Sequence, residues 1–458
     1  MSFAFPLRRA TTALATAAGI CRGTVLNSAY VAGSRENLYT STPMPEDFVL
    51  ERIVVVHRHG DRSQIARSIG PNFPESTDVA EFWKTKLPDP SSLRAMASVA
   101  SSASPLAPDA IGSSSSDVPE GEGMYYGEDA RSFPYAQLTE IGARQLEEVG
   151  RQLRKRYHSP LTEGESVPLS GLIYARSTNM CRTMQSLRSL LVGLLDPPKE
   201  LDEAAAAALR SAIQIDTRPK SKEVLFPTAD GPCDGLTQRR SVIFPPGYME
   251  EKFAGFVDLE RRVKEALGYS DKVSWLTVKE ILTCRHVPGL PLPGGLSARD
   301  EEDISRLAGW MWGEMHADER YNRLAIGRFI GELLSDLRGA RQDKRLLIYS
   351  GHDSTLVPLL CALGCYDGVW PPYASFLVLE LVRSKRSGES FVRAVYNDEP
   401  VAMASCGGSD VWCPLHTFLA RLEAVSLSPS AYKEECQQGA ISEKENKAAE
   451  LEIKATIG

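Results

Sequence analysis

Short runs of consecutive apolar residues alternate with helical patterns along this chain. The runs lack polar alternation, which is typical of strands buried on both faces of a sheet. They are RIVVV (52–56), GLIYA (171–175), RLLIYS (345–350), FLVLELV (376–382) and FVRAVY (391–396). Helical periodicity is found at 139–157, in the segment ending at 195, and at 354–363. This alternation predicts an α/β fold with a mixed, mostly parallel sheet flanked by helices.

The 458 residues are enough for one core domain that carries insertions. Pro and Gly breaks separate helical patterns over a long middle region, whereas Ser, Ala, Pro and Gly dominate a shorter one. We expect an α/β core at 45–200 and 335–430, a helical cap inserted at 200–335, a low-complexity surface insertion at 91–123 and a flexible tail at 437–458.

The first 40 residues have the composition of a targeting segment. They contain no Asp or Glu before Glu36, but several arginines among many Ala, Ser and Thr residues. This composition favours mitochondrial import. The run from Ala10 to Ile20 can instead serve as a weak secretory core, so a secreted or lysosomal-type location stays open as the alternative.

Charge and cysteine content exclude several classes of protein. A formal net charge of −7 argues against a general nucleic-acid binder, and no apolar run approaches the ~18–20 residues of a transmembrane helix. The nine cysteines include no CxxC pair, so there is no zinc signature. Cys406, Cys413 and Cys436 are compatible with either thiols or a partial disulfide set.

Charged and polar residues follow three of the apolar runs directly. The first run leads into HRHGDR (57–62), the second into RST (176–178) and the third into GHD (351–353). In open α/β sheets, ligands bind outside the carboxyl ends of the strands. The sequence therefore predicts one site that combines Arg58, His59, Arg62, Arg176, His352 and Asp353.

This combination of side chains has the chemistry of a phosphate site. The planar guanidinium group of arginine matches phosphate oxygens and stays charged at any working pH. Three arginines can stabilise a phosphoryl group while its charge spreads during transfer. An imidazole can then attack phosphorus, and Asp353 can supply a proton to the leaving oxygen.

RHGDR (58–62), IYARST (173–178) and GHD (351–353) resemble the histidine acid phosphatases, the branch-two histidine phosphatases. The resemblance implies a phosphoglycerate-mutase-like sheet with an inserted cap. It implies that His59 forms a phosphohistidine and that Asp353 is the proton donor. It also implies that no metal or other cofactor takes part, and that phosphate is bound by Arg58, Arg62, Arg176 and His352.

Three further stretches refine the expected substrate. RSTN (176–179), VWCPLHTFL (411–419) and LSPSAY (427–432) resemble a mitochondrial group within this family that acts on lysophosphatidic acid. The expected partner is therefore a small phosphate monoester, and in particular a lysophospholipid monophosphate. Gln64 stands where the family usually has a proline, which leaves the rigidity of the first loop open.

Other functions remain as alternatives. A broad-specificity or phytate-like phosphatase uses the same residues, but phytate requires a broad basic pocket, and the segment 63–70 offers only Arg67. A metal-dependent hydrolase built on His57 and His59 lacks a third histidine at ligand spacing. A non-catalytic phosphate-binding scaffold needs the arginines but neither His59 nor Asp353.

Arg182 is expected to pair with a carboxylate near the site or to face solvent.

Overall fold

The computed structural model of the chain separates into two units, Met1–Thr40 and Ser41–Gly458. The expected targeting segment and residues 438–458 of the expected tail lie outside the described residues, so both expectations stay predictions. The described residues are 44–65, 68, 70–73, 77–102, 134–197, 202–227, 231–406 and 411–437.

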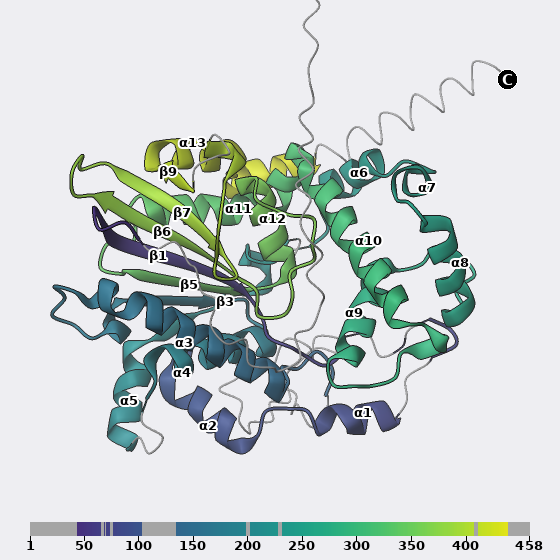
Figure 1. The fold of residues 1–458 in the computed structure, drawn as a ribbon, viewed down its shortest axis with the longest axis horizontal. Helices are drawn as coiled ribbons and strands as arrows, with labels where there is room; N and C mark the ends of the chain where they lie inside the picture. The colour runs from purple at the N-terminus through teal and green to yellow at the C-terminus, as the bar shows by residue number, and fades with distance from the viewer. Residues whose placement is uncertain are drawn as a thin grey trace, which may run out of the picture. The chain divides into compact units, whose positions relative to one another are not determined.

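A mixed sheet flanked by helices is the frame of the described chain (Figure 1). Its order is β2-β4-β3-β5-β1-β6-β7-β8, with β9 pairing with β7. The block from β2 to β1 is parallel, and the remaining pairs are antiparallel. The strands are β1 (Phe48–Arg58), β2 (Ser101–Ser102), β3 (Ile173–Ser177), β4 (Gln214–Asp216), β5 (Leu346–Gly351), β6 (Phe376–Ser384), β7 (Ser390–Tyr396), β8 (Glu399–Val401) and β9 (Trp412–Pro414).

Helices account for most of the remaining described residues. They are α1 (Thr77–Lys84), α2 (Pro90–Val99), α3 (Glu140–Thr162), α4 (Cys181–Leu195), α5 (Glu203–Ala212), α6 (Asp234–Ile243), α7 (Tyr248–Lys252), α8 (Phe256–Leu267), α9 (Trp275–His286), α10 (Ala298–Ala317), α11 (Glu319–Leu337), α12 (Asp353–Leu363) and α13 (Leu415–Val425). The predicted fold class is confirmed, as are the expected strands and the helices that follow them.

The consecutive valines of β1 are explained by helices on both faces of the sheet. Ile53 and Val55 point to the face covered by α3 and α4. Val54 and Val56 alternate to the other face, which is covered by α11, α12 and α13. Because successive side chains of a strand point to opposite faces, a strand between two helical layers needs apolar residues at every position.

Three segments differ from the expected organisation. Residues 214–216, expected in the cap, form β4 beside β3, and α11 packs on α12 and α13 of the core. In the expected low-complexity insertion, residues 90–99 form α2, because Asp89 caps the helix with bonds from Ser91 N and Ser92 N and Pro90 occupies the first turn. Residues 103–123 lie outside the described residues.

The cap comprises α6 to α10, which lie beside one end of the sheet (Figure 1). α8, α9 and α10 pack around their own apolar cluster, which includes Val263, Leu282 and Leu307. A disulfide joins Cys233, at the start of α6, to Cys436, and a second joins Cys406 to Cys413. Of the two options for the C-terminal cysteines, disulfide pairing is therefore the one observed.

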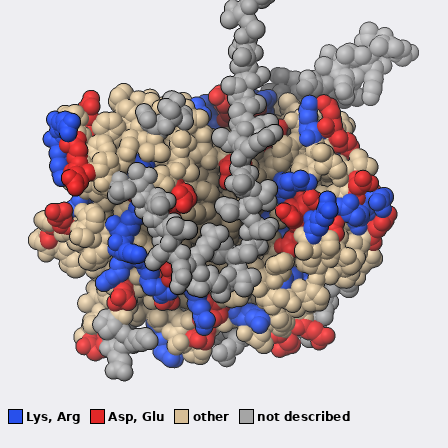
Figure 2. Space-filling view, viewed as in Figure 1, with Lys and Arg blue, Asp and Glu red and all other residues tan. Residues whose placement is uncertain are grey.

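The surface carries both signs of charge. On the face seen in Figure 2, basic and acidic side chains are interspersed. Several of the arginines on α3 pair with acids one turn away, such as Arg144 with Glu140 and Arg151 with Glu147. None of the helices in the described part of the chain has the length and apolarity that a membrane span requires.

Candidate functional site

Three strand ends meet at one edge of the sheet, as the sequence predicted. Arg58 of β1 is in register with Gly351 of β5, and Ser177 of β3 is in register with Ser350. The loops stay joined beyond these pairs, because His59 N donates to the Gly351 carbonyl (3.1 Å). The polar residues that follow each strand are thereby brought side by side.

Glycine allows the first loop to lie against the start of α3. A Cβ atom on Gly60 would lie 2.3 Å from the Gly142 carbonyl oxygen, and one on Gly142 would lie 2.2 Å from the Asp61 carbonyl oxygen. Thr139, the N-cap of α3, donates from its hydroxyl to the Asp61 carboxylate (2.5 Å). Any larger residue at either glycine would push the RHGDR loop away from this helix.

His59 is held as a neutral imidazole in one tautomer. Its Nδ1 lies 2.9 Å from the Gly60 carbonyl oxygen, which can only accept, so Nδ1 carries the proton and Nε2 keeps its lone pair. Burial lowers the pKa of His59 well below its ordinary value, and the charges of Arg182 and Arg58 lower it further. A neutral imidazole with a free Nε2 lone pair is the form that can attack phosphorus.

Arg58 connects the first and third strand ends. Its guanidinium group forms a salt bridge with Asp353 (2.8 Å), donates to the Pro371 carbonyl (2.6 Å) and lies 4.2 Å from the ring centroid of Tyr373. Asp353 begins α12. Although burial alone would raise the pKa of Asp353, Arg58 and Lys279 lower it to about 2. The carboxyl group is therefore ionised while Arg58 is its partner.

Arg62 is fully buried and pairs with Glu280 of α9 in the cap. The same glutamate accepts a hydrogen bond from Ile65 N (2.9 Å) and from the thiol of Cys284 (3.3 Å). Glu280 therefore fixes both the backbone of the first loop and the direction of Arg62. Nothing in the sequence linked α9 to this site.

His352 faces His59 from the third strand end. The centroids of the two imidazole rings lie 5.5 Å apart, and the ring planes meet at 71°. His352 Nε2 lies 3.0 Å from the Thr178 hydroxyl of the second strand end, and Phe226 packs edge-on against the ring at 5.1 Å. His352 is thus the residue that joins all three loops.

Arg176 does not join this group. Its guanidinium group is fully buried and pairs with Glu223 (3.0 Å) and Glu332 of α11. Glu223 also accepts hydrogen bonds from Val224 N and Leu225 N, so Arg176 holds in place the loop that leads to Phe226. Two carboxylates thus already bond the Arg176 guanidinium group, and this pairing links β3 to α11 and to the loop before Phe226.

Arg182, which also follows the second strand, is the arginine of this segment whose charge acts on His59 and His352. It is in the first turn of α4, directly after the second strand end, and is 6% exposed. Among the charged groups around His59 and His352, Arg182 lowers the pKa of both imidazoles most. The signal that could have identified it is its position, because the first turn of a helix that follows a strand is where anions bind in α/β sheets.

A cavity of about 350 Å³ opens over the strand ends. Arg58, Arg62 and Asp353 lie in its wall, together with Lys279 and Glu280 of α9. The remaining lining is mostly aromatic and aliphatic, from Phe226, Pro227, Leu236, Leu276, Trp312, Tyr321, Ala325 and Trp370, with His316 and Ser354. The sequence placed none of these lining residues in the site, whether they come from the cap, such as Leu276 and Trp312, or from outside it, such as Tyr321 and Trp370.

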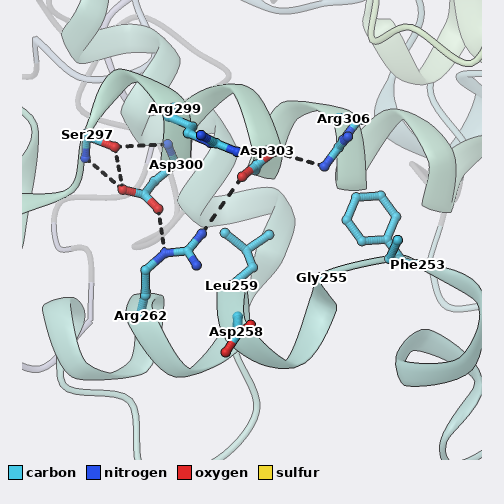
Figure 3. Close-up of a pocket in the computed structure, with 11 residues that line it drawn as sticks. Phe253, Gly255, Asp258, Leu259, Arg262, Ser297, Arg299, Asp300, Asp303 and Arg306 are labelled. Atoms are coloured by element: carbon cyan, nitrogen blue, oxygen red, sulfur yellow. Dashed lines mark hydrogen bonds and ion pairs between the residues drawn. The ribbon is translucent and has the colours of Figure 1, made fainter.

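A second hollow of about 550 Å³ lies between α8 and α10 (Figure 3). Its acidic and basic side chains contact one another, since Arg262 pairs with Asp300 (2.8 Å) and Arg306 with Asp303 (2.9 Å). None of its lining residues comes from the three strand ends. Of these two hollows, the one lined by Arg58, Arg62 and Asp353 is the one at the strand ends.

Metal ligands are not assembled around the histidines. His57 is fully buried and contacts the Arg58 carbonyl through Nδ1 (3.0 Å). Burial lowers its pKa to about 4. Within the described ranges, no group of three or more His, Cys, Asp or Glu side chains is arranged to hold a metal ion.

Comparison with known sequences identifies related proteins. The sequence model of the histidine phosphatase superfamily (branch 2) matches residues 49–238 and 257–397. Lysophosphatidic acid phosphatase type 6 of Bos taurus is 28% identical over 416 residues, which cover 85% of this chain and 86% of the relative. Lysosomal acid phosphatase of Bos taurus is 31% identical over 319 residues, covering 66% of this chain and 73% of the relative.

Solved structures with a similar fold include phytases. The phytase of Hafnia alvei in complex with tartrate aligns with a TM-score of 0.54 at 14% identity, covering 84% of this chain and all of the phytase. The phytase of Citrobacter braakii aligns with a TM-score of 0.53 at 17% identity, covering 85% of this chain and 99% of the phytase. At these identities the likeness concerns the fold.

Proposed function

The chain belongs to the histidine phosphatase superfamily (branch 2) and is a phosphoric monoester hydrolase, and from this premise we propose that it works through a phosphohistidine on His59. The observation that carries the proposal is the neutral His59 imidazole, with its Nε2 lone pair free, among Arg58, Arg62 and Arg182. The proposed site keeps the predicted residues except that Arg182 replaces Arg176.

A phosphate ester binds to arginines that already pair with carboxylates. In the structure Asp353 is paired with Arg58, and Glu280 with Arg62. A phosphate ester that enters from the cavity shares these guanidinium groups with the two carboxylates, while Arg182 and His352 bind its other oxygens. Bidentate arginine contacts orient the phosphorus toward Nε2 of His59.

The first chemical step transfers the phosphoryl group to His59. Nε2 forms a bond to phosphorus as the bond to the ester oxygen breaks, and the leaving oxygen takes its proton from Asp353. The pKa of Asp353 is about 2 while Arg58 is its partner, so this pKa must rise, and the carboxylate must take up a proton from solvent, before the group can donate. A bound phosphate dianion raises it by adding negative charge beside the carboxylate.

The second step regenerates the enzyme. The Asp353 carboxylate accepts a proton from water, the water oxygen attacks phosphorus, and the bond from phosphorus to Nε2 breaks. Inorganic phosphate then leaves, and Asp353 releases this proton to solvent as it pairs with Arg58 again. The same group acts as acid and then as base, as microscopic reversibility requires for a double displacement.

Asp353→Asn should slow alkyl phosphates much more than aryl phosphates. An alkoxide is a poor leaving group without a proton, and general acid catalysis contributes about 10²–10⁴-fold, whereas p-nitrophenolate leaves unprotonated. We expect such a loss of kcat with glycerol 3-phosphate and a much smaller loss with p-nitrophenyl phosphate, both measured by steady-state phosphate release. Equal losses of kcat with both substrates would contradict the role of Asp353 as proton donor.

We further propose that the substrate is a lysophospholipid monophosphate such as lysophosphatidic acid. The cavity is lined by Arg58 and Arg62 of the first strand end, by Lys279 of α9 and otherwise mostly by aromatic and aliphatic side chains. Trp312 of α10 lines this cavity, whereas Trp310 of the same helix packs with the cap cluster. A single phosphate with an apolar body fits such a wall, and a polyphosphate such as phytate would lack cations for its other phosphates.

A phosphate-release screen tests this substrate class. Purified protein is compared on lysophosphatidic acid, phytate, sugar phosphates and phosphotyrosine, with and without a chelator. We expect the highest kcat/KM with lysophosphatidic acid and no effect of chelation. A preference for phytate would favour the broad or phytate-like alternative, and loss of activity on chelation would favour the metal-dependent one.

The disulfides and the relatives support a proposal about location. Disulfides form in oxidising compartments, and the described chain has two. Relatives of this chain include lysosomal acid phosphatases. We therefore favour a secreted or lysosomal-type location over the mitochondrial matrix, which fractionation of cells expressing the full chain would distinguish.

A further inference from the structure

Lys279 of α9 is a buried cation in the wall of the catalytic cavity. Its side chain is 6% exposed, and it lines the cavity together with Arg58 and Asp353. Its ammonium nitrogen lies 4.5 Å from the ring centroid of Trp370. Among the described residues, no carboxylate lies within salt-bridge distance of this nitrogen and no hydrogen bond to it is formed.

An unpaired ammonium group at this depth is costly to the protein. Burial first, and then the charge of Arg58, lower the pKa of Lys279 to about 7, while Asp353 opposes this shift. A buried charge without a partner is normally either removed from a sequence or kept for a ligand. Because the nitrogen lines a cavity, an acceptor oxygen that enters can pair with it and stabilise its charged form.

The neighbours of Lys279 indicate which part of a substrate it meets. The adjacent Glu280 pairs with Arg62, which places the phosphate end of the site on one side of α9. The charge of Lys279 instead lowers the pKa of Asp353, and only the charge of Arg58 lowers that pKa more. Asp353 donates its proton to the leaving oxygen in the proposed mechanism, so Lys279 lies on the leaving-group side.

We propose that Lys279 determines specificity by binding an oxygen of the leaving group, on the carbon next to the ester carbon, as in the hydroxyl of a glycerol phosphate. The proposal rests on the proposed function and names a contact that the phosphate group does not make. Trp370 stabilises the ammonium group by a cation–π contact. Its ring meets that of Trp312 at 4.9 Å, so both belong to the aromatic wall.

Paired substrates isolate this contact. Lys279→Met keeps the length of the side chain and removes its charge. Glycerol 3-phosphate and propyl phosphate differ in the neighbouring hydroxyl groups, as do lysophosphatidic acid and dodecyl phosphate. We expect the substitution to lower kcat/KM by about 10- to 100-fold for the oxygenated member of each pair and by less than about 3-fold for the plain alkyl ester.

Controls separate the possible failures. Lys264→Met removes a partly exposed cap lysine on α8 that pairs with Glu260, and should change neither member of a pair. An equal loss on all substrates would mean that Lys279 serves the phosphate or Asp353, and no loss would mean that it contacts no ligand. Either result overturns the proposal. If the double-displacement mechanism itself were wrong, His59→Ala would retain activity on all four substrates.

Discussion

His59→Ala is expected to lower kcat for p-nitrophenyl phosphate by about 10⁴-fold or more, as the loss of a covalent nucleophile does in other hydrolases. The arginines remain and still bind phosphate, but no lone pair is left to attack phosphorus. Brief reaction with a ³²P-labelled substrate, quenched and counted after gel separation, should show an acid-labile, base-stable phosphoenzyme in the wild type. No label should appear in the variant.

His286→Ala provides the matched control for this result. His286 lies at the end of α9, is half exposed and pairs with Glu301 away from the strand ends. Its loss should leave both turnover and labelling unchanged. Circular dichroism should show the same fold for both variants, because His59 contributes one hydrogen bond to the Gly60 carbonyl. Near-normal turnover by His59→Ala would contradict the phosphohistidine mechanism.

The sheet could be predicted because its pattern is local. Buried parallel strands need uninterrupted apolar residues, and β1, β3 and β5 each provide them. Polar residues that follow an apolar strand mark its carboxyl end, and the carboxyl ends of neighbouring parallel strands lie at one edge. The convergence of His59, His352 and Asp353 therefore followed from the strand pattern and the fold class together.

The choice between Arg176 and Arg182 depended on information that the strand pattern lacks. Both follow the same apolar run, but β3 extends to Ser177, so Arg176 is still a strand residue and its side chain direction is set by the sheet. Glu223 and Glu332, its partners, are 47 and 156 residues away in sequence. Long-range pairs of this kind are invisible to periodicity, which explains why the strand-end argument placed Arg176 in the site.

The cap side of the site was unpredictable for a related reason. Lys279, Glu280 and Leu276 share one face of α9, but whether that face meets solvent or the strand ends depends on how the cap packs. The residues that follow a strand in sequence predict which side chains lie at its carboxyl end. They do not predict that a helix some 220 residues later packs against that end. The substrate-facing wall is therefore the part of the site that only the structure reveals.

Arg182→Met should mainly lower activity, whereas Arg176→Met should mainly lower stability. Removing Arg182 takes one cation from the developing phosphoryl charge, and loss of one such contact typically costs about 10²–10³-fold in kcat. Removing Arg176 instead leaves Glu223 buried without its guanidinium partner, which costs about 3–5 kcal/mol of unfolding free energy. Phosphate release and denaturant unfolding, measured on both variants, should separate the two residues.

The pH profile supplies a readout that mere loss of packing would not change. The positive charge of Arg182 lowers the pKa of His59, so in Arg182→Met that pKa rises and His59 is protonated at a higher pH. The acid limb of kcat/KM for p-nitrophenyl phosphate should therefore move to higher pH in Arg182→Met and stay in place in Arg176→Met. If Arg176→Met moved the limb instead, with the larger loss of kcat, Arg176 would be the phosphate ligand that the strand pattern had predicted, because only a charge close to His59 can change its protonation.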